Sequence, residues 1–165
     1  MSGTGEQQLG PRAERAWKDL ALHIEWHPDR FWVAWVFTDD ARVVRAYQQR
    51  MAALLADKER TQRIIEPATP ARARVCLDAI LSEDTAAAHC VWVNLVRIDV
   101  LATPESEDSW SHAWQWLMMR ANEHRGRLSR HLPGGLIIAG SSAFKAGTAA
   151  AAPDLWSIRA LVLEP

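Results

Sequence analysis

The sequence predicts a three-layer α/β/α domain on a mainly parallel sheet of five strands. Short apolar runs rich in β-branched and aromatic residues alternate with longer segments of helical periodicity. The connections between these segments have ordinary lengths, which favours parallel strands joined by helical crossovers. The chain has 165 residues, 48% of them hydrophobic, which suffices for one buried core. We expect residues 12–165 to form a single domain, excised from a longer chain.

The chain is predicted to begin with a tail, a helix and a central strand. Residues 1–11 are small, polar and without periodicity, which predicts a disordered tail. From Arg12 onward, apolar residues recur at intervals of three and four, which predicts a helix. Pro28 ends this helix, because a proline disfavours helical backbone in the residue before it. Residues 31–37 are all apolar and predict a strand covered on both faces.

A second helix, a weaker strand and a third helix follow. Asp39 or Asp40 is predicted to cap the second helix, whose apolar stripe spans residues 43–55. The opposite face of this helix is predicted to be solvated and carries Arg42, Arg45, Gln48, Gln49 and Arg50. Residues 62–66 predict a short strand. The pair Thr69-Pro70 is a helix start, and apolar spacing extends that helix over 69–81.

The C-terminal half holds one long helix and the three remaining strands. Residues 90–98 form an apolar run that predicts the third strand. Residues 103–108 are acidic and loop-like, which suits the positive end of the helix predicted over 110–131. Residues 136–140 predict the fourth strand and residues 158–163 the fifth. Strand and helix thus alternate through the whole chain.

Charge and composition narrow the classes of partner. Nineteen basic and twenty acidic side chains leave a formal net charge of −1, from which we expect no nucleic-acid partner. No apolar run approaches the ~18 residues of a membrane span, so we expect no membrane partner. The two cysteines, Cys76 and Cys90, are too few for a disulfide framework, which favours a reducing, cytoplasmic setting.

Ligands of open α/β sheets collect at the carboxyl ends of the strands. Here those ends are predicted to carry Thr38, Asp39, Asp40, Asp99, Ser141 and Ser142. A phosphate-binding loop needs glycines and a lysine, and residues 38–41 supply neither. Two carboxylates instead stand at a helix N-terminus, where they would repel a triphosphate unless a metal intervened. One alternative stays open: a nucleotide site of unusual type, using Asp99 with a metal and Ser141 or Ser142.

Other groups that could support catalysis lack their usual partners. His23 and His27 are one helical turn apart, a spacing that can hold zinc, but Ile24 occupies the position of the metalloprotease glutamate. Cys90 precedes an apolar strand, and the adjacent His89 would point to the opposite face. We therefore predict no catalytic residue, no metal site and no cofactor, and a protein that is not an enzyme.

The chain contains nine tryptophans, and some do not fit the predicted core. Trp116 and Met119 lie off the apolar stripe of their helix, with His112 and Glu123 at matching spacing. Exposed tryptophan and methionine are typical anchors for a protein partner. These four residues are therefore predicted to bind another protein or another domain of the parent chain. The alternative is a second packing layer within this domain.

The order of elements resembles the α/β core of AAA+ and STAND-type P-loop ATPases. The segments 132–140 (LPGGLIIAG) and 152–163 (APDLWSIRALVL) resemble the end of an N-terminal module in large bacterial proteins. Those proteins carry tetratricopeptide repeats or effector domains and are associated with defence and signalling. The similarity covers roughly residues 13–165.

This sequence departs from active P-loop ATPases at two positions. It has no Walker A glycines or lysine between Phe37 and Ala41, and no acidic pair after Ile98. The resemblance therefore implies a degenerate relative with a P-loop-ATPase-like topology, retained as a recognition or regulatory module of a bacterial signalling or defence protein.

Overall fold

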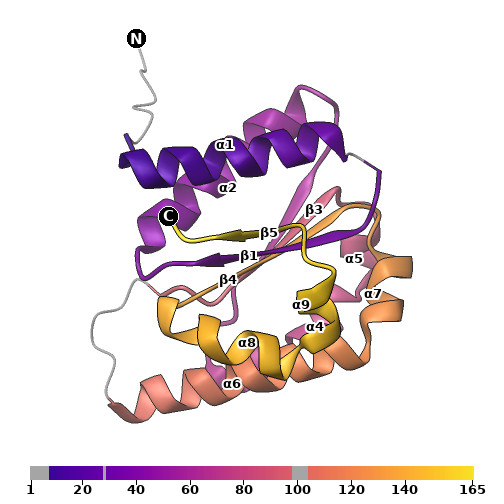
Figure 1. Ribbon diagram of the computed structural model, residues 1–165. Coiled ribbons are helices and arrows are strands. Elements are labelled where there is room, and N and C mark those ends of the chain that lie inside the picture. Colours follow the sequence, from indigo (N-terminus) through magenta and orange to yellow (C-terminus); the bar gives the residue numbers. More distant parts are fainter. Residues whose placement is uncertain (1–7, 28, 98–103) are drawn as a thin grey trace.

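The computed structural model describes residues 8–27, 29–97 and 104–165, and its centre is one parallel sheet (Figure 1). The strand order is β2-β3-β4-β1-β5, and every pair of neighbours is parallel. The strands are β1 (Trp32–Phe37), β2 (Gln62–Ile65), β3 (Cys90–Asn94), β4 (Gly135–Gly140) and β5 (Leu161–Leu163). The predicted fold class is confirmed.

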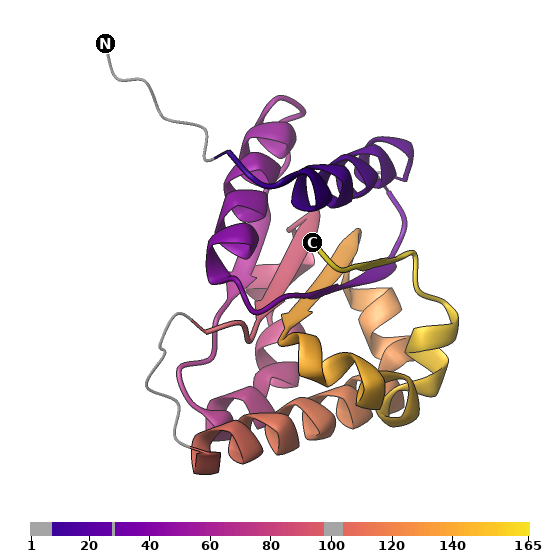
Figure 2. The ribbon, with the colours of Figure 1, turned by 60° about the vertical axis from the view of Figure 1, so that its left-hand side comes forward.

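Helices cover both faces of the sheet (Figures 1 and 2). On one face lie α1 (Pro11–Trp26) and α2 (Ala41–Ala56), whose apolar stripes share a core cluster with the sheet. The helices on the side of the other face are α3 (Pro70–Arg74), α4 (Cys76–Ile80), α5 (Glu83–Ala86), α6 (Pro104–Glu123), α7 (Arg125–His131), α8 (Lys145–Ala151) and α9 (Pro153–Ser157). No helix among the described residues combines the length and apolarity needed to span a membrane.

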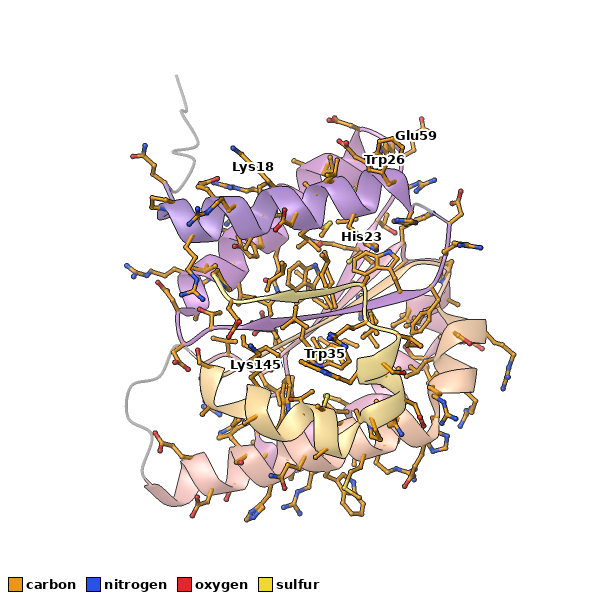
Figure 3. The ribbon with its side chains drawn as sticks, viewed as in Figure 1. Lys18, His23, Trp26, Trp35, Glu59 and Lys145 are labelled. Atoms are coloured by element: carbon orange, nitrogen blue, oxygen red, sulfur yellow. The ribbon has the colours of Figure 1, made fainter. Side chains whose placement is uncertain are left out.

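Alternation along the strands distributes their large side chains between the two cores. Trp35 of β1 is fully buried in the core beneath α6, where its indole N–H donates to the sulfur of Met118 at 3.4 Å (Figure 3). Trp92 of β3 faces the opposite core, and its N–H donates to Gln62 Oε1 at 3.0 Å. These indole groups contribute buried area without leaving their N–H groups unpaired.

Strand β4 carries glycine at both ends because tryptophan rings lie directly against its backbone. A Cβ atom on Gly135 would come within 2.2 Å of the Trp32 ring. A Cβ atom on Gly140 would come within 2.4 Å of the Trp114 ring. Side chains in real structures do not approach so closely, so both positions depend on glycine.

Several predicted boundaries are wrong in the half of the chain that packs around α6. The helix expected over 69–81 is divided at Val75 into α3 and α4. Helix α6 begins at Pro104, so most of the expected loop 103–108 is helical, and the helix expected over 110–131 is interrupted at His124. A proline at the first helical position explains the earlier start.

Further differences concern the ends of two predicted strands and the helices α1 and α8. Strand β3 ends at Asn94 instead of residue 98, because the Asn94 side chain accepts from the Val96 N–H at 2.9 Å and turns the backbone. Strand β5 begins at Leu161 instead of residue 158, because α9 precedes it. Helix α8, within an alanine-rich stretch, was not predicted. Helix α1 begins at Pro11, and Leu9 before it packs against the core.

Candidate functional site

The connection from β1 to α2 consists only of Thr38, Asp39 and Asp40. A Walker A loop needs the eight-residue pattern GxxxxGK[ST] at this place. Asp40 caps α2, since its Oδ1 accepts from the Arg42 N–H at 3.0 Å. The Arg42 guanidinium binds the same carboxylate at 3.0 and 2.9 Å and lowers the pKa of Asp40. The protein's own carboxylate therefore occupies the anion-binding end of α2.

Asp39 joins the ends of β1 and β4. Its Oδ1 accepts from the Ser141 hydroxyl at 2.6 Å and from the Ser142 N–H at 3.2 Å. The bond from Ser141 is the main cause of the lowered pKa of Asp39, and partial burial acts against it. Thr38 is buried, and its Oγ1 accepts from the Asp40 N–H at 3.1 Å. The structure thus brings these predicted ligand-binding residues together, but their hydrogen bonds run to one another.

Asp99, the remaining member of the predicted set, lies outside the described residues. The prediction that it could hold a metal with Ser141 or Ser142 is therefore not tested. Across the described part of the chain, no group of three or more His, Cys, Asp or Glu residues is placed to hold a metal ion.

Two cavities open at the carboxyl edge of the sheet. The first, of about 360 Å³, lies between the ends of β1 and β4 and helix α6, and its charged lining residues are Asp39, Arg97, Glu107 and Asp108. We call it the acidic cavity. The Arg97 guanidinium lies 4.5 Å from the centre of the Trp110 ring, and both residues also line the second cavity.

The second cavity, of about 210 Å³, lies between α2 and the segments that follow β2 and β3. Three residues of α2 line it: Ala41, Arg45 and Gln48. We call it the Gln48 cavity. The prediction that Gln48 lies on a solvated face is wrong, because only 6% of the residue is exposed. The spacing i, i+4, i+7 that puts these residues on one stripe is a signal that sequence reasoning missed.

The surface of α6 carries the predicted partner-binding residues. Trp116 is 50% exposed and Met119 is 45% exposed, and His112 and Glu123 are exposed on the same side of the helix. Trp114 lies on the opposite, buried side. The alternative of a second packing layer is wrong for Trp116 and Met119, because both expose about half of their surface.

The surroundings of the histidine pair and of the two cysteines indicate structural roles. The centres of the His23 and His27 rings are 4.5 Å apart, and the centre of the His23 ring lies 4.8 Å from that of the Trp32 ring. Both cysteines are unbridged and buried, and burial raises the pKa of both thiols, that of Cys76 to about 11. A thiol that stays protonated is a poor nucleophile.

Comparisons with known proteins give similarity at the level of fold. No protein-family model matches the sequence, and no curated protein sequence matches it. The Aeropyrum pernix ORC1 protein, solved in complex with DNA, superimposes with a TM-score of 0.54 at 14% identity. That superposition covers 98% of this chain and 47% of ORC1.

Two further solved structures are less similar. Aeropyrum pernix ORC2, in ADPNP-ADP complexes, gives a TM-score of 0.46 at 12% identity and covers 96% of this chain and 48% of ORC2. A chain of Drosophila ORC bound to poly(dA/dT) DNA and Cdc6 gives a TM-score of 0.46 at 12% identity. That superposition covers 99% of this chain and 35% of the ORC chain. This chain spans less than half the length of each of these proteins.

The ORC1 comparison corrects the expectation about nucleic acid. A net charge of −1 predicts no nucleic-acid partner, yet a protein of similar fold has been solved in complex with DNA. Net charge sums over the whole chain and does not describe one local surface or a neighbouring domain. The net charge of this chain therefore does not exclude a nucleic-acid partner, and that prediction is corrected. What the comparisons establish is that this chain has a P-loop ATPase-like α/β fold.

Proposed function

We propose that this chain is a non-catalytic interaction module that binds a protein through the exposed face of α6. The exposure of Trp116 and Met119 carries this proposal, because the two side chains stand together on a helix whose other face is fully packed. An exposed tryptophan beside a methionine supplies a large apolar anchor at the centre of an interface. His112 and Glu123 flank them and supply a polar rim.

The state of the β1–α2 connection supports a non-catalytic role. Asp40 fills the N-terminus of α2, and Asp39 is engaged with Ser141. A triphosphate at this position would meet two carboxylates and no lysine of a phosphate-binding loop. The chemistry of the site thus favours a fold kept for recognition over one that hydrolyses a nucleotide.

The chemistry of α6 defines the partner. The partner offers an apolar pocket that accepts an indole and a thioether, with polar groups around it for His112, Glu123 and Arg120. Arg120 is already paired with Glu123 at 3.0 Å, so the rim is nearly neutral. In the setting that the sequence resemblance implies, this partner is another domain of the parent chain or a separate protein of a bacterial signalling or defence system.

The test compares two pairs of exposed apolar residues. Trp116→Ala with Met119→Ala removes the proposed anchor on α6. Leu22→Ala with Trp26→Ala is the matched control, because both of these residues are exposed on α1. A partner is isolated with the wild-type chain and its affinity is then measured by calorimetry for all three proteins. We expect the α6 variant to bind at least about tenfold more weakly, and the α1 variant to bind like wild type.

Two results would contradict the proposal. One is a partner whose affinity does not change in the α6 variant. The other is a chain that binds duplex DNA, measured by fluorescence anisotropy at low and moderate salt, with no protein partner at all. A thermal-shift screen with ATP and magnesium tests nucleotide binding, because saturating ligand must stabilise the folded state, and we expect no shift.

A further inference from the structure

The Gln48 cavity has the properties of a small-molecule site that is separate from α6. It lies at the carboxyl edge of the sheet, where parallel α/β sheets bind ligands. Its volume of about 210 Å³ corresponds to roughly seven water molecules of about 30 Å³ each. That is below the roughly 300 Å³ of pockets for drug-sized ligands. The cavity therefore fits a metabolite-sized molecule.

Gln48 supplies an unused hydrogen-bond donor. The residue lines the cavity, is 6% exposed, and its Nε2 has no hydrogen-bond partner among the described residues. An unpaired buried amide N–H destabilises the fold, and native proteins contain few such groups. A ligand that places an oxygen acceptor beside Gln48 Nε2 would remove this destabilisation.

The walls around Gln48 are held in place by their own hydrogen bonds. Gln62 Nε2 donates to the backbone carbonyl of Gln48 at 2.9 Å, and Gln62 Oε1 accepts from the Trp92 indole N–H at 3.0 Å. Asn94 donates to Glu66 Oε1 at 3.1 Å, which ties the segment after β3 to the segment after β2. A site with fixed walls loses little entropy when a ligand binds.

The charged residues that line the cavity favour a negatively charged ligand. Arg45 and Arg97 contribute two guanidinium groups, and Glu66 contributes one carboxylate, which already accepts from Asn94. Arg45 lies one turn before Gln48 on α2, and both residues line the same cavity. We propose that the Gln48 cavity binds a small organic anion, with its oxygen acceptors on Gln48 and its charge on Arg45.

The experiment is an NMR titration of the intact chain with succinate and with inorganic phosphate. We expect succinate to shift the Gln48 side-chain amide signal and the backbone signals of Arg45 and Asn94 in a saturable way. The signal of Gln48 is identified by its loss in Gln48→Leu, a variant of similar side-chain volume. Succinate should bind about tenfold or more weakly to Gln48→Leu and to Arg45→Gln, as expected for the loss of one hydrogen bond to a charged group.

The controls are neighbours on α2 that do not line the cavity. Gln49→Leu and Arg42→Gln should leave the titration unchanged, since both residues are exposed. If Gln48→Leu does not fold, Arg45→Gln still tests the proposal, because Arg45 is exposed and its replacement should leave the fold intact.

The proposal fails if neither anion gives a saturable shift up to about 10 mM, where a site with Kd near about 1 mM is mostly filled. It also fails if Gln48→Leu and Arg45→Gln bind like wild type, or if shifts spread evenly over surface arginines. No variant touches α6, so either outcome is independent of the proposed function.

Discussion

The Ser141 hydroxyl donates a 2.6 Å hydrogen bond to Asp39, and this bond joins two strand ends that are 102 residues apart in the chain. Strands β1 and β4 are neighbours in the sheet, so their carboxyl ends meet at one edge. The Ser142 N–H donates to the same carboxylate oxygen. A hydrogen bond within the protein therefore joins the two strand ends at the edge that binds phosphate in P-loop proteins.

Ser141→Ala is expected to raise the pKa of Asp39 toward its ordinary value of 3.8. Because the folded-state pKa of Asp39 is lowered, its ionised form stabilises the fold fully above pH 3.8 and loses that effect as the pH falls through the lower value. At neutral pH the variant should lose about 1 kcal/mol or less, since Asp39 is exposed. Urea denaturation at neutral and acidic pH measures the difference, which should shrink in acid.

A suitable control for this change is Ser129→Ala. The Ser129 hydroxyl is also exposed, but it donates to the Gly126 carbonyl and to no carboxylate. Replacing Ser129 should change the free energy of unfolding by the same amount at both pH values. If the two variants show the same pH dependence, the bond from Ser141 is not what makes the ionised form of Asp39 stabilise the fold.

Trp114→Ala and Trp116→Ala should differ strongly in stability although they are two positions apart. Trp114 is 1% exposed, packs against Phe37 and Phe144, and donates to Thr148 at 3.0 Å. Its loss should cost about 3–5 kcal/mol. Trp116→Ala should cost about 0.5 kcal/mol, as at other surface positions. Urea denaturation of both variants tests this, and a comparable loss for Trp116 would assign that residue to the core.

Gly140→Ala should destabilise the fold by about 1–3 kcal/mol, the usual cost of overpacking. The added methyl group would lie 2.4 Å from the Trp114 ring, which is itself fixed by Thr148. Gly147→Ala is the matched control, because its nearest neighbour would be Gln115 Nε2 at 3.8 Å. Alanine is a better helix former than glycine, so this change in α8 should stabilise by up to about 1 kcal/mol. Thermal denaturation gives the sign of both effects.

The sheet could be predicted because the burial of its central strands is visible in the sequence. Strands β1 and β4 are apolar at every position and begin within one residue of their predicted limits. The boundaries around α6 depend on tertiary packing instead. The break at Val75 separates two short helices that both pack beside α6, and local periodicity alone continues through it.

In the candidate site, too, some features follow from the local sequence and others depend on tertiary packing. The capping role of Asp40 follows from local chain chemistry, and the prediction named Asp39 and Asp40 as candidates. The bond from Ser141 to Asp39 requires the pairing of β1 with β4, which no local pattern encodes. The burial of Gln48 likewise depends on Gln62 of β2 lying beside α2. The exposure of Trp116 could be predicted, because its position relative to the apolar stripe is a property of one helix.

His23 should make the fold sensitive to mild acid. Its ring lies between α1 and the sheet, beside His27 and Trp32, and its Nε2 has no partner among the described residues (Figure 3). Burial, and secondarily the charge of His27, lower the pKa of His23 below 6.5. The neutral ring is therefore the form that the fold accepts, so stability is complete above pH 6.5 and falls as the pH drops toward the lower folded-state pKa.

His23→Gln should remove part of this sensitivity, because glutamine does not titrate. The melting temperatures of wild type and variant are compared at roughly pH 8 and roughly pH 5.5, a range in which histidine changes charge and most carboxylates do not. Wild type should lose more stability between the two pH values than His23→Gln does. His27→Gln serves as the control. Because His27 is exposed, this variant should lose nearly as much stability between the two pH values as wild type does. If wild type and His23→Gln lose the same amount, the acid sensitivity comes from other groups and the His23 site tolerates a charge.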